Sequence, residues 1–157
     1  MNGRILQNGQ KPQVHMWYPH MLPADASTWT RALQLYRHNF SAVWYDVHVG
    51  KAVEPPEDSP EYIFAVAAGV SRKRIDVIIE RPGDFLITEV KPYGSHDALG
   101  QAWAYLELVR KEFNLSKPSR PCVVCDRMDH DYGRIAQEWG VVIYETGFIE
   151  GMAGGIL

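Results

Sequence analysis

The sequence predicts an α/β domain in which helices flank a mixed β-sheet. Short apolar stretches typical of strands alternate with stretches of helical periodicity, in the order α-β-β-β-α-β-α-β. Two of the apolar stretches are separated only by Arg81-Pro82-Gly83, a turn signal that indicates an antiparallel hairpin. The chain has 157 residues, of which 46% are hydrophobic and 22% charged, the composition of a globular protein with a sizeable core.

The first part of the chain is expected to be an irregular N-terminal arm. Residues 1–23 mix Gly, Pro, Gln and Asn with scattered aromatic side chains. Trp17, Tyr18 and Met21 are expected to anchor this arm, and residues 24–157 are expected to form a single domain.

The first helix and strand are predicted from their periodicity. A helix is expected from Ser27, capped by Ser27 or Asp25, because large side chains recur at helical spacing: Trp29, Leu33, Tyr36 and Phe40. A strand over 43–49 should place alternate residues on one face: Val43, Tyr45, Val47 and Val49. A proline-rich loop over 51–60 and a short helix over 61–68 should follow.

The rest of the chain alternates strands with helices. Pro92, Gly94 and Ser95 should end the second strand of the hairpin before a long helix begins. The expected elements, in order, are strands over 74–80 and 84–91, a helix from about 96 to 113, a strand over 122–125, a helix over 131–139 and a strand over 141–145.

Charge and hydropathy indicate a cytoplasmic protein without a membrane partner. No apolar run reaches the roughly 20 residues that span a bilayer, and the first residues lack the apolar core of a secretion signal. The net charge of −3 gives no global electrostatic case for nucleic-acid binding. A local basic cluster, Arg72-Lys73-Arg74, would suffice to contact phosphates, although a solvated charged surface explains such a cluster more often.

The two cysteines, Cys122 and Cys125, lie in an apolar run that is predicted to be a strand. Two thiols cannot complete a four-ligand zinc site or hold a four-cysteine iron–sulfur cluster. They are interpreted as small buried hydrophobic residues.

Acidic residues interrupt both strands of the predicted hairpin. Asp76 lies within one apolar run, and the other ends in Glu89-Val90-Lys91. Because Glu89 and Lys91 are two apart on a strand, they point to the same face. Two carboxylates and the Val90 carbonyl would make an oxygen-only site suited to Mg²⁺ or Mn²⁺, with Lys91 placed to stabilise negative charge on a phosphate. Edge-strand ion pairs with neighbouring basic residues are the alternative explanation.

Together with the following helix, these residues resemble a known nuclease family. The chain carries Asp76, then Glu89-Val90-Lys91, and then Gln101 and Tyr105 one helical turn apart. This order resembles the motif order of the PD-(D/E)XK nuclease superfamily, in particular that of its RecB and Cas4-like branch. The resemblance implies a restriction-endonuclease-like core, α-β-β-β-α-β, followed here by a C-terminal α-β.

The resemblance also implies roles for these residues. Asp76, Glu89 and the Val90 carbonyl would bind the metal, and Lys91 would be the catalytic lysine. Gln101 would orient the lysine or a metal-bound water, and Tyr105 would contact DNA or support the site. The basic residues 72–74 are further DNA-binding candidates: Arg72, Lys73 and Arg74.

The sequence departs from the family pattern in one respect that concerns the metal. The family often places another acidic residue on the first helix, but residues 27–40 contain none. Glu54, Glu57 or Glu61 could substitute for it.

The resemblance implies a Mg²⁺- or Mn²⁺-dependent deoxyribonuclease that hydrolyses DNA phosphodiester bonds. The setting expected by analogy is phage or mobile-element DNA processing, in the host cytoplasm or in a virion. The partners of this enzyme would be DNA and either further copies of the chain or other proteins. The alternative is a nuclease-fold structural or DNA-binding component of a viral assembly without catalytic activity.

Overall fold

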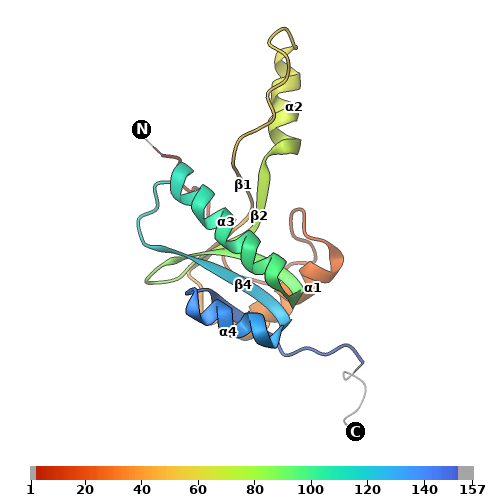
Figure 1. Cartoon of the computed structure of the whole chain (residues 1–157), viewed down its shortest axis with the longest axis vertical. Helices are drawn as coiled ribbons and strands as arrows, with labels where there is room; N and C mark the ends of the chain where they lie inside the picture. The colour runs from red at the N-terminus through yellow and green to blue at the C-terminus, as the bar shows by residue number, and fades with distance from the viewer. Residues whose placement is uncertain (1–2, 152–157) are drawn as a thin grey trace.

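The computed structural model describes residues 3–151 and shows one mixed five-stranded sheet with helices on both faces (Figure 1). The strands lie side by side in sequence order: β1 (Ala42–Val49), β2 (Lys73–Glu80), β3 (Phe85–Gly94), β4 (Ser119–Met128) and β5 (Val142–Glu145). The helices are α1 (Pro23–Tyr36) with a short 3₁₀ turn (Arg37–Asn39), α2 (Glu61–Ser71), α3 (His96–Glu112) and α4 (His130–Glu138). The predicted α/β fold class is therefore confirmed.

The β2–β3 hairpin is antiparallel, as predicted. Its turn is closed by a hydrogen bond from the Arg81 backbone N–H to the Asp84 carbonyl (2.9 Å) and by an ion pair between the same two side chains (2.6 Å). β1 is also antiparallel to β2, whereas β3, β4 and β5 are parallel to one another. Helix α3 makes the crossover between β3 and β4 that a parallel pair requires.

The core lies on both faces of the sheet. On one face, Trp29 and Leu33 of α1 pack with alternate strand residues such as Leu86 and Val90. On the other face, α3 buries one stripe of side chains: Ala98, Leu99, Ala102, Leu106 and Val109. Cys122 and Cys125 of β4 are fully buried on opposite faces, as expected for small hydrophobic residues, and burial raises the pKa of each thiol to about 12.

The alternation predicted for the first strand is wrong beyond Asp46. Val43 and Tyr45 pack on the α1 side of the sheet, but Val47 and Val49 pack on the α3 side. The cause is the left-handed backbone of Asp46, whose φ is 52°, because this conformation reverses the side to which the following residues point.

The first helix begins at Pro23, earlier than predicted. Proline is favoured in the first helical turn because its φ is already helical, and no side chain caps this helix. The Asp25 side chain is therefore not the predicted cap but lies inside the first turn. In the arm before the helix, Tyr18 is buried and Met21 packs partly against the core, whereas Trp17 is 71% exposed and anchors nothing.

Helix α2 extends to Ser71, beyond the predicted end at residue 68, and projects away from the sheet beside the loop that leads into it (Figure 1). No residue of α2 is buried. Within residues 3–151, no helix combines the length and apolar character needed to cross a bilayer.

Candidate active site

The acidic residues of the hairpin lie where β2 separates from β3. The two strands pair from Glu80 with Phe85 to Val77 with Thr88. Asp76 and Glu89 are the next residues beyond the last pair, so they face each other where the strands diverge. One Asp76 carboxylate oxygen accepts a hydrogen bond from the Val90 backbone N–H at 2.9 Å.

Lys91 joins these carboxylates to the first helix. Its ammonium group lies 3.4 Å from Glu89 Oε1 and 3.7 Å from Asp25 Oδ2. Asp25 and Glu89 are buried, and Asp76 and Lys91 are partly buried. Side chains from α1, β2 and β3 thus form a cluster of four ionisable groups, which we call the acidic site: Asp25, Asp76, Glu89 and Lys91.

Burial and mutual repulsion raise the pKa values of the acidic-site carboxyl groups. Burial is the main cause for Glu89, whose pKa rises to about 8, and the nearby Asp76 raises it further. The pKa of Asp76 rises to about 6, mainly through burial. Burial also raises the pKa of Asp25. Partial burial alone would lower the pKa of Lys91, but the surrounding carboxylates raise it.

Asp126, a buried carboxylate outside the acidic site, provides a comparison because several donors form hydrogen bonds to it. Asp126 of β4 accepts hydrogen bonds from Arg31 at 2.7 and 2.9 Å, from Thr28 at 2.8 Å and from the Thr146 hydroxyl. Burial would raise the pKa of Asp126, but these donors outweigh burial and lower it. Glu89, by contrast, is partnered only by Lys91 among the described residues, and its negative charge is therefore poorly compensated.

Asp25 is the acidic-site residue that sequence reasoning missed as a site residue. The helical spacing predicts a helix from Ser27, which makes Asp25 one of two cap candidates rather than a site residue. Pro23 was the signal that could have moved the helix start, since proline is favoured at the first helical position. The alternatives expected for a further acid do not lie in this site, because Glu54, Glu57 and Glu61 are exposed on α2 and the loop before it.

Helix α3 carries two polar side chains with site roles implied by the resemblance, Gln101 and Tyr105, on one of its faces. The pKa of Tyr105 is raised, first by burial and then by the charges of Glu89 and Asp76, which places its hydroxyl within their field. Gln101 lies one turn earlier on the same face. Its side-chain carbonyl oxygen is buried and, within the described part of the chain, has no hydrogen-bond partner.

The three basic residues at the start of the hairpin, Arg72, Lys73 and Arg74, have different surroundings. Arg72 binds Glu112 at 2.5 Å and the Gly50 carbonyl at 2.8 Å. Arg74 contacts Asp46 at 3.0 Å, and only Lys73 is exposed. Two of the three candidates for DNA contact are thus already engaged in contacts within the chain.

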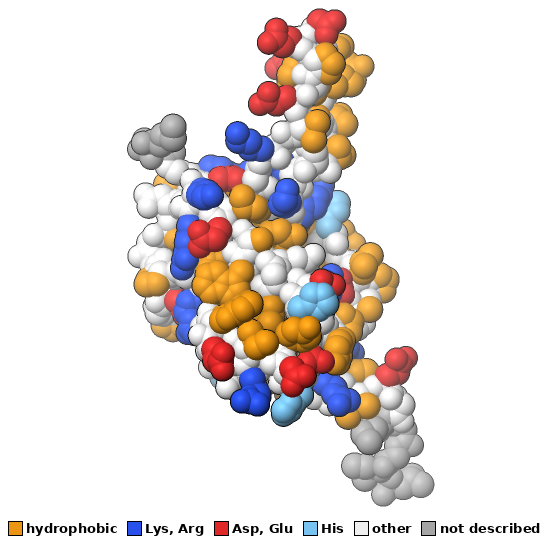
Figure 2. Space-filling model, viewed as in Figure 1, with side chains coloured by type: hydrophobic (Ala, Val, Ile, Leu, Met, Phe, Trp, Pro, Cys, Tyr) orange, Lys and Arg blue, Asp and Glu red, His pale blue; other side chains and the backbone are white. Residues whose placement is uncertain are grey.

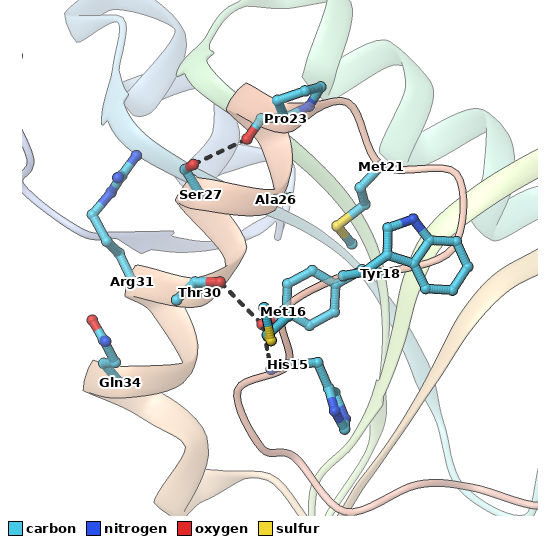
Figure 3. Close-up of a pocket in the computed structure, with 11 residues that line it drawn as sticks. His15, Met16, Tyr18, Met21, Pro23, Ala26, Ser27, Thr30, Arg31 and Gln34 are labelled. Atoms are coloured by element: carbon cyan, nitrogen blue, oxygen red, sulfur yellow. Dashed lines mark hydrogen bonds between the residues drawn. The ribbon is translucent and has the colours of Figure 1, made fainter.

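A separate hollow lies between the N-terminal arm and the outer face of α1 (Figure 3). Figure 3 shows Tyr18 and Met21 on one wall, with Ser27, Thr30 and Arg31 along the helix. None of the four acidic-site residues lines it, so this hollow is not part of the acidic site.

The acidic site has side chains of the kind that bind a divalent cation, although they are not arranged as a preformed coordination site. Within residues 3–151, no three His, Cys, Asp or Glu side chains are already arranged as a metal-binding group. However, Asp76 and Glu89 offer hard oxygen donors whose repulsion a cation would relieve, and the Gln101 oxygen has no partner among residues 3–151. The residues present therefore fit Mg²⁺ or Mn²⁺.

Comparison with known proteins adds two structures of low similarity. No family model matches the chain, and no curated protein sequence matches it. A crystal structure of AF1548, a protein of unknown function, aligns with 76% of this chain at 17% identity and a TM-score of 0.47. A crystal structure of VC1899 from Vibrio cholerae aligns with 78% of this chain at 14% identity and a TM-score of 0.42. The alignments span 55% of AF1548 and 30% of VC1899.

Proposed function

We propose that this protein is a divalent-metal-dependent nuclease of the PD-(D/E)XK type that hydrolyses DNA phosphodiester bonds. The observation that carries the proposal is the convergence of Asp25 and Glu89 on Lys91 where β2 and β3 separate, with Asp76 bound to the backbone N–H of the adjacent Val90. A purely structural ion pair needs one carboxylate for one ammonium group, whereas this site gathers three.

In this proposal, Asp76, Glu89 and the Val90 carbonyl hold Mg²⁺ or Mn²⁺. The bound cation would neutralise the carboxylates and polarise a phosphodiester group. Lys91 would stabilise the negative charge that develops on the phosphate and hold the attacking water by hydrogen bonding. The cluster is partly open to solvent through Lys91, whose side chain is 36% exposed, so a phosphate can approach it.

The neighbouring residues would then have supporting roles. Asp25 would position the Lys91 ammonium group, because it is the second carboxylate in reach of that group. The buried side-chain oxygen of Gln101, which has no hydrogen-bond partner in the described part of the chain, would accept a hydrogen bond from Lys91 or from a bound water. Tyr105 and the exposed Lys73 would contact the DNA strand, with Arg72 and Arg74 contributing to its electrostatic attraction.

Phage or mobile-element DNA processing in the cytoplasm of a host cell is the setting we propose, by analogy with other small nucleases that carry this motif order. A nuclease-fold component of a viral assembly without activity is the competing proposal. The two differ in whether the acidic site binds metal and cleaves DNA.

A cleavage assay tests the proposed function. Purified full-length protein is incubated with linear, circular, single-stranded and branched DNA in Mg²⁺, in Mn²⁺ or in EDTA. We expect metal-dependent cleavage of at least one substrate and none in EDTA. Absence of cleavage in every metal condition, by protein shown to be folded by circular dichroism, would favour the assembly component.

A further inference from the structure

Helix α2 is an apolar helix without a partner in the described chain. Figure 2 shows it as an arm that extends from the body, with hydrophobic side chains along one side. Tyr62, Val66 and Val70 are 65%, 55% and 75% exposed. Leaving several apolar side chains exposed to water is unfavourable, so such a helix is expected to be covered in the working protein.

The exposed apolar residues form a continuous stripe along α2. Tyr62, Val66 and Val70 are spaced i, i+4 and i+8, which places them on the same face of a helix. The small residues Ala65 and Gly69 lie beside them, and a Cβ added at Gly69 would meet no other atom. A second helix can therefore approach this face closely.

Charge is distributed unequally along the α2 arm, which consists of α2 and the loop over residues 51–60 that leads into it. Its tip is acidic, with four exposed carboxylates: Glu54, Glu57, Asp58 and Glu61. Its base carries Lys51 and Lys73, both exposed, together with Arg72. In Figure 2 acidic side chains gather at the far end of the arm and basic ones where it joins the body.

We propose that α2 is the interface of a homodimer in which the arms of two copies pack antiparallel. The stripe is centred on Val66, so a two-fold axis there places Tyr62 of one copy against the second copy's Val70. The same arrangement brings the acidic tip of each arm to the basic base of the other. A parallel arrangement would instead place the acidic tips together.

This charge complementarity favours a second copy of the chain, rather than DNA, as the partner that covers the apolar stripe of α2. A duplex of DNA would meet four carboxylates at the tip of the arm and would be repelled by them. Isologous contacts of this kind close with two copies. A single pair of helices this short buries less than the roughly 1,200 Å² of a stable interface, so the dimer should be reversible.

Sedimentation equilibrium of the full-length protein tests the proposal between about 1 µM and about 300 µM, a range that covers reversible dimers. We expect a concentration-dependent dimer for the wild type. Val66→Glu should abolish it, because the two-fold axis places the two new carboxylates together, without lowering the melting temperature. Val53→Glu is the matched control, since Val53 is 66% exposed on the same arm and contacts Ser71 on the opposite side of α2. It should leave the dimer intact.

Charge exchange tests the antiparallel direction. Lys73→Glu should weaken the dimer by roughly tenfold, because it replaces attraction by repulsion at both ends of the interface. Combining it with Asp58→Lys should restore the affinity. A wild type that stays monomeric overturns the proposal, as does a dimer that survives Val66→Glu. A monomer whose retention on duplex DNA falls with Val66→Glu would also overturn it and assign the stripe to nucleic acid.

Discussion

The carboxylate of Asp25, in the first turn of α1, lies 3.7 Å from the ammonium group of Lys91 in β3. Lys91 also contacts Glu89 at 3.4 Å, so one lysine joins the first helix to the hairpin. This relationship makes the acidic site a product of the tertiary fold rather than of the hairpin alone. It also supplies the acid on the first helix that the nuclease resemblance implies.

Asp25 should act by positioning Lys91. Asp25→Ala is expected to reduce the cleavage rate by roughly tenfold and to lower the pKa of Lys91 in the pH–rate profile, because one of its carboxylate partners is lost. Asp97→Ala is the matched control, since Asp97 also lies in the first turn of a helix but is exposed. Loss of Mg²⁺ binding in Asp25→Ala, as complete as in Asp76→Asn, would instead make Asp25 a metal ligand.

The raised pKa of Glu89 predicts how the stability of the metal-free protein changes with pH. The folded protein binds the Glu89 proton more tightly than the unfolded chain, since the pKa rises from 4.5 to about 8. The free energy of unfolding in EDTA should therefore fall as pH rises from about 5 to about 8, by on the order of 3 kcal/mol.

Glu89→Gln should remove most of this pH dependence and should make the metal-free protein more stable than the wild type at about pH 8. Asp126→Asn is the matched control at a buried carboxylate whose pKa is lowered, and it should lose stability by about 1–3 kcal/mol. Urea unfolding at several pH values measures both effects. Destabilisation by Glu89→Gln at every pH would identify Glu89 as part of a structural ion pair.

Metal binding should depend on both hairpin carboxylates. Isothermal titration of Mg²⁺ or Mn²⁺ into the wild type should show a site whose affinity increases as pH rises from about 6 to about 8, because the metal competes with the Asp76 and Glu89 protons. Asp76→Asn and Glu89→Gln should each abolish binding, whereas Asp84→Asn, at the turn of the same hairpin, should not. Equal binding by all four proteins would exclude the acidic site as the metal site.

Gln101 should lower the stability of the metal-free protein while supporting DNA cleavage. Its buried oxygen has no partner in the described chain, so Gln101→Leu is expected to stabilise the metal-free protein by about 1 kcal/mol. The same change should reduce cleavage, because the oxygen would no longer hold Lys91 or water. Gln137→Leu on the exposed side of α4 should change neither property. Unchanged cleavage in Gln101→Leu would remove Gln101 from the site.

Much of the fold follows from local sequence signals. The hairpin, the long helix and the cysteine-bearing strand were predictable because apolar periodicity and the Arg81-Pro82-Gly83 turn act locally. The order of acidic residues and Lys91 in that hairpin likewise predicted which side chains belong together.

The features that could not be predicted arise from contacts between distant elements or from a single backbone conformation. Asp25 reaches Lys91 only because α1 packs on the sheet. The change of face in β1 depends on the positive φ of Asp46, which no periodicity reveals. That Arg72 and Arg74 are engaged by Glu112 and Asp46 also depends on tertiary packing.

Lys91 is the residue whose removal tests the account most directly. Metal-dependent DNA cleavage is compared between the wild type, Lys91→Ala and Lys117→Ala. Lys117 is the matched control, because its ion pair with Glu80 lies at the opposite end of the same hairpin. We predict that Lys91→Ala stays folded but loses at least about a hundredfold in rate, since one preorganised donor contributes on the order of 3 kcal/mol to the transition state, and that Lys117→Ala retains activity. Equal cleavage by Lys91→Ala and the wild type would contradict the account.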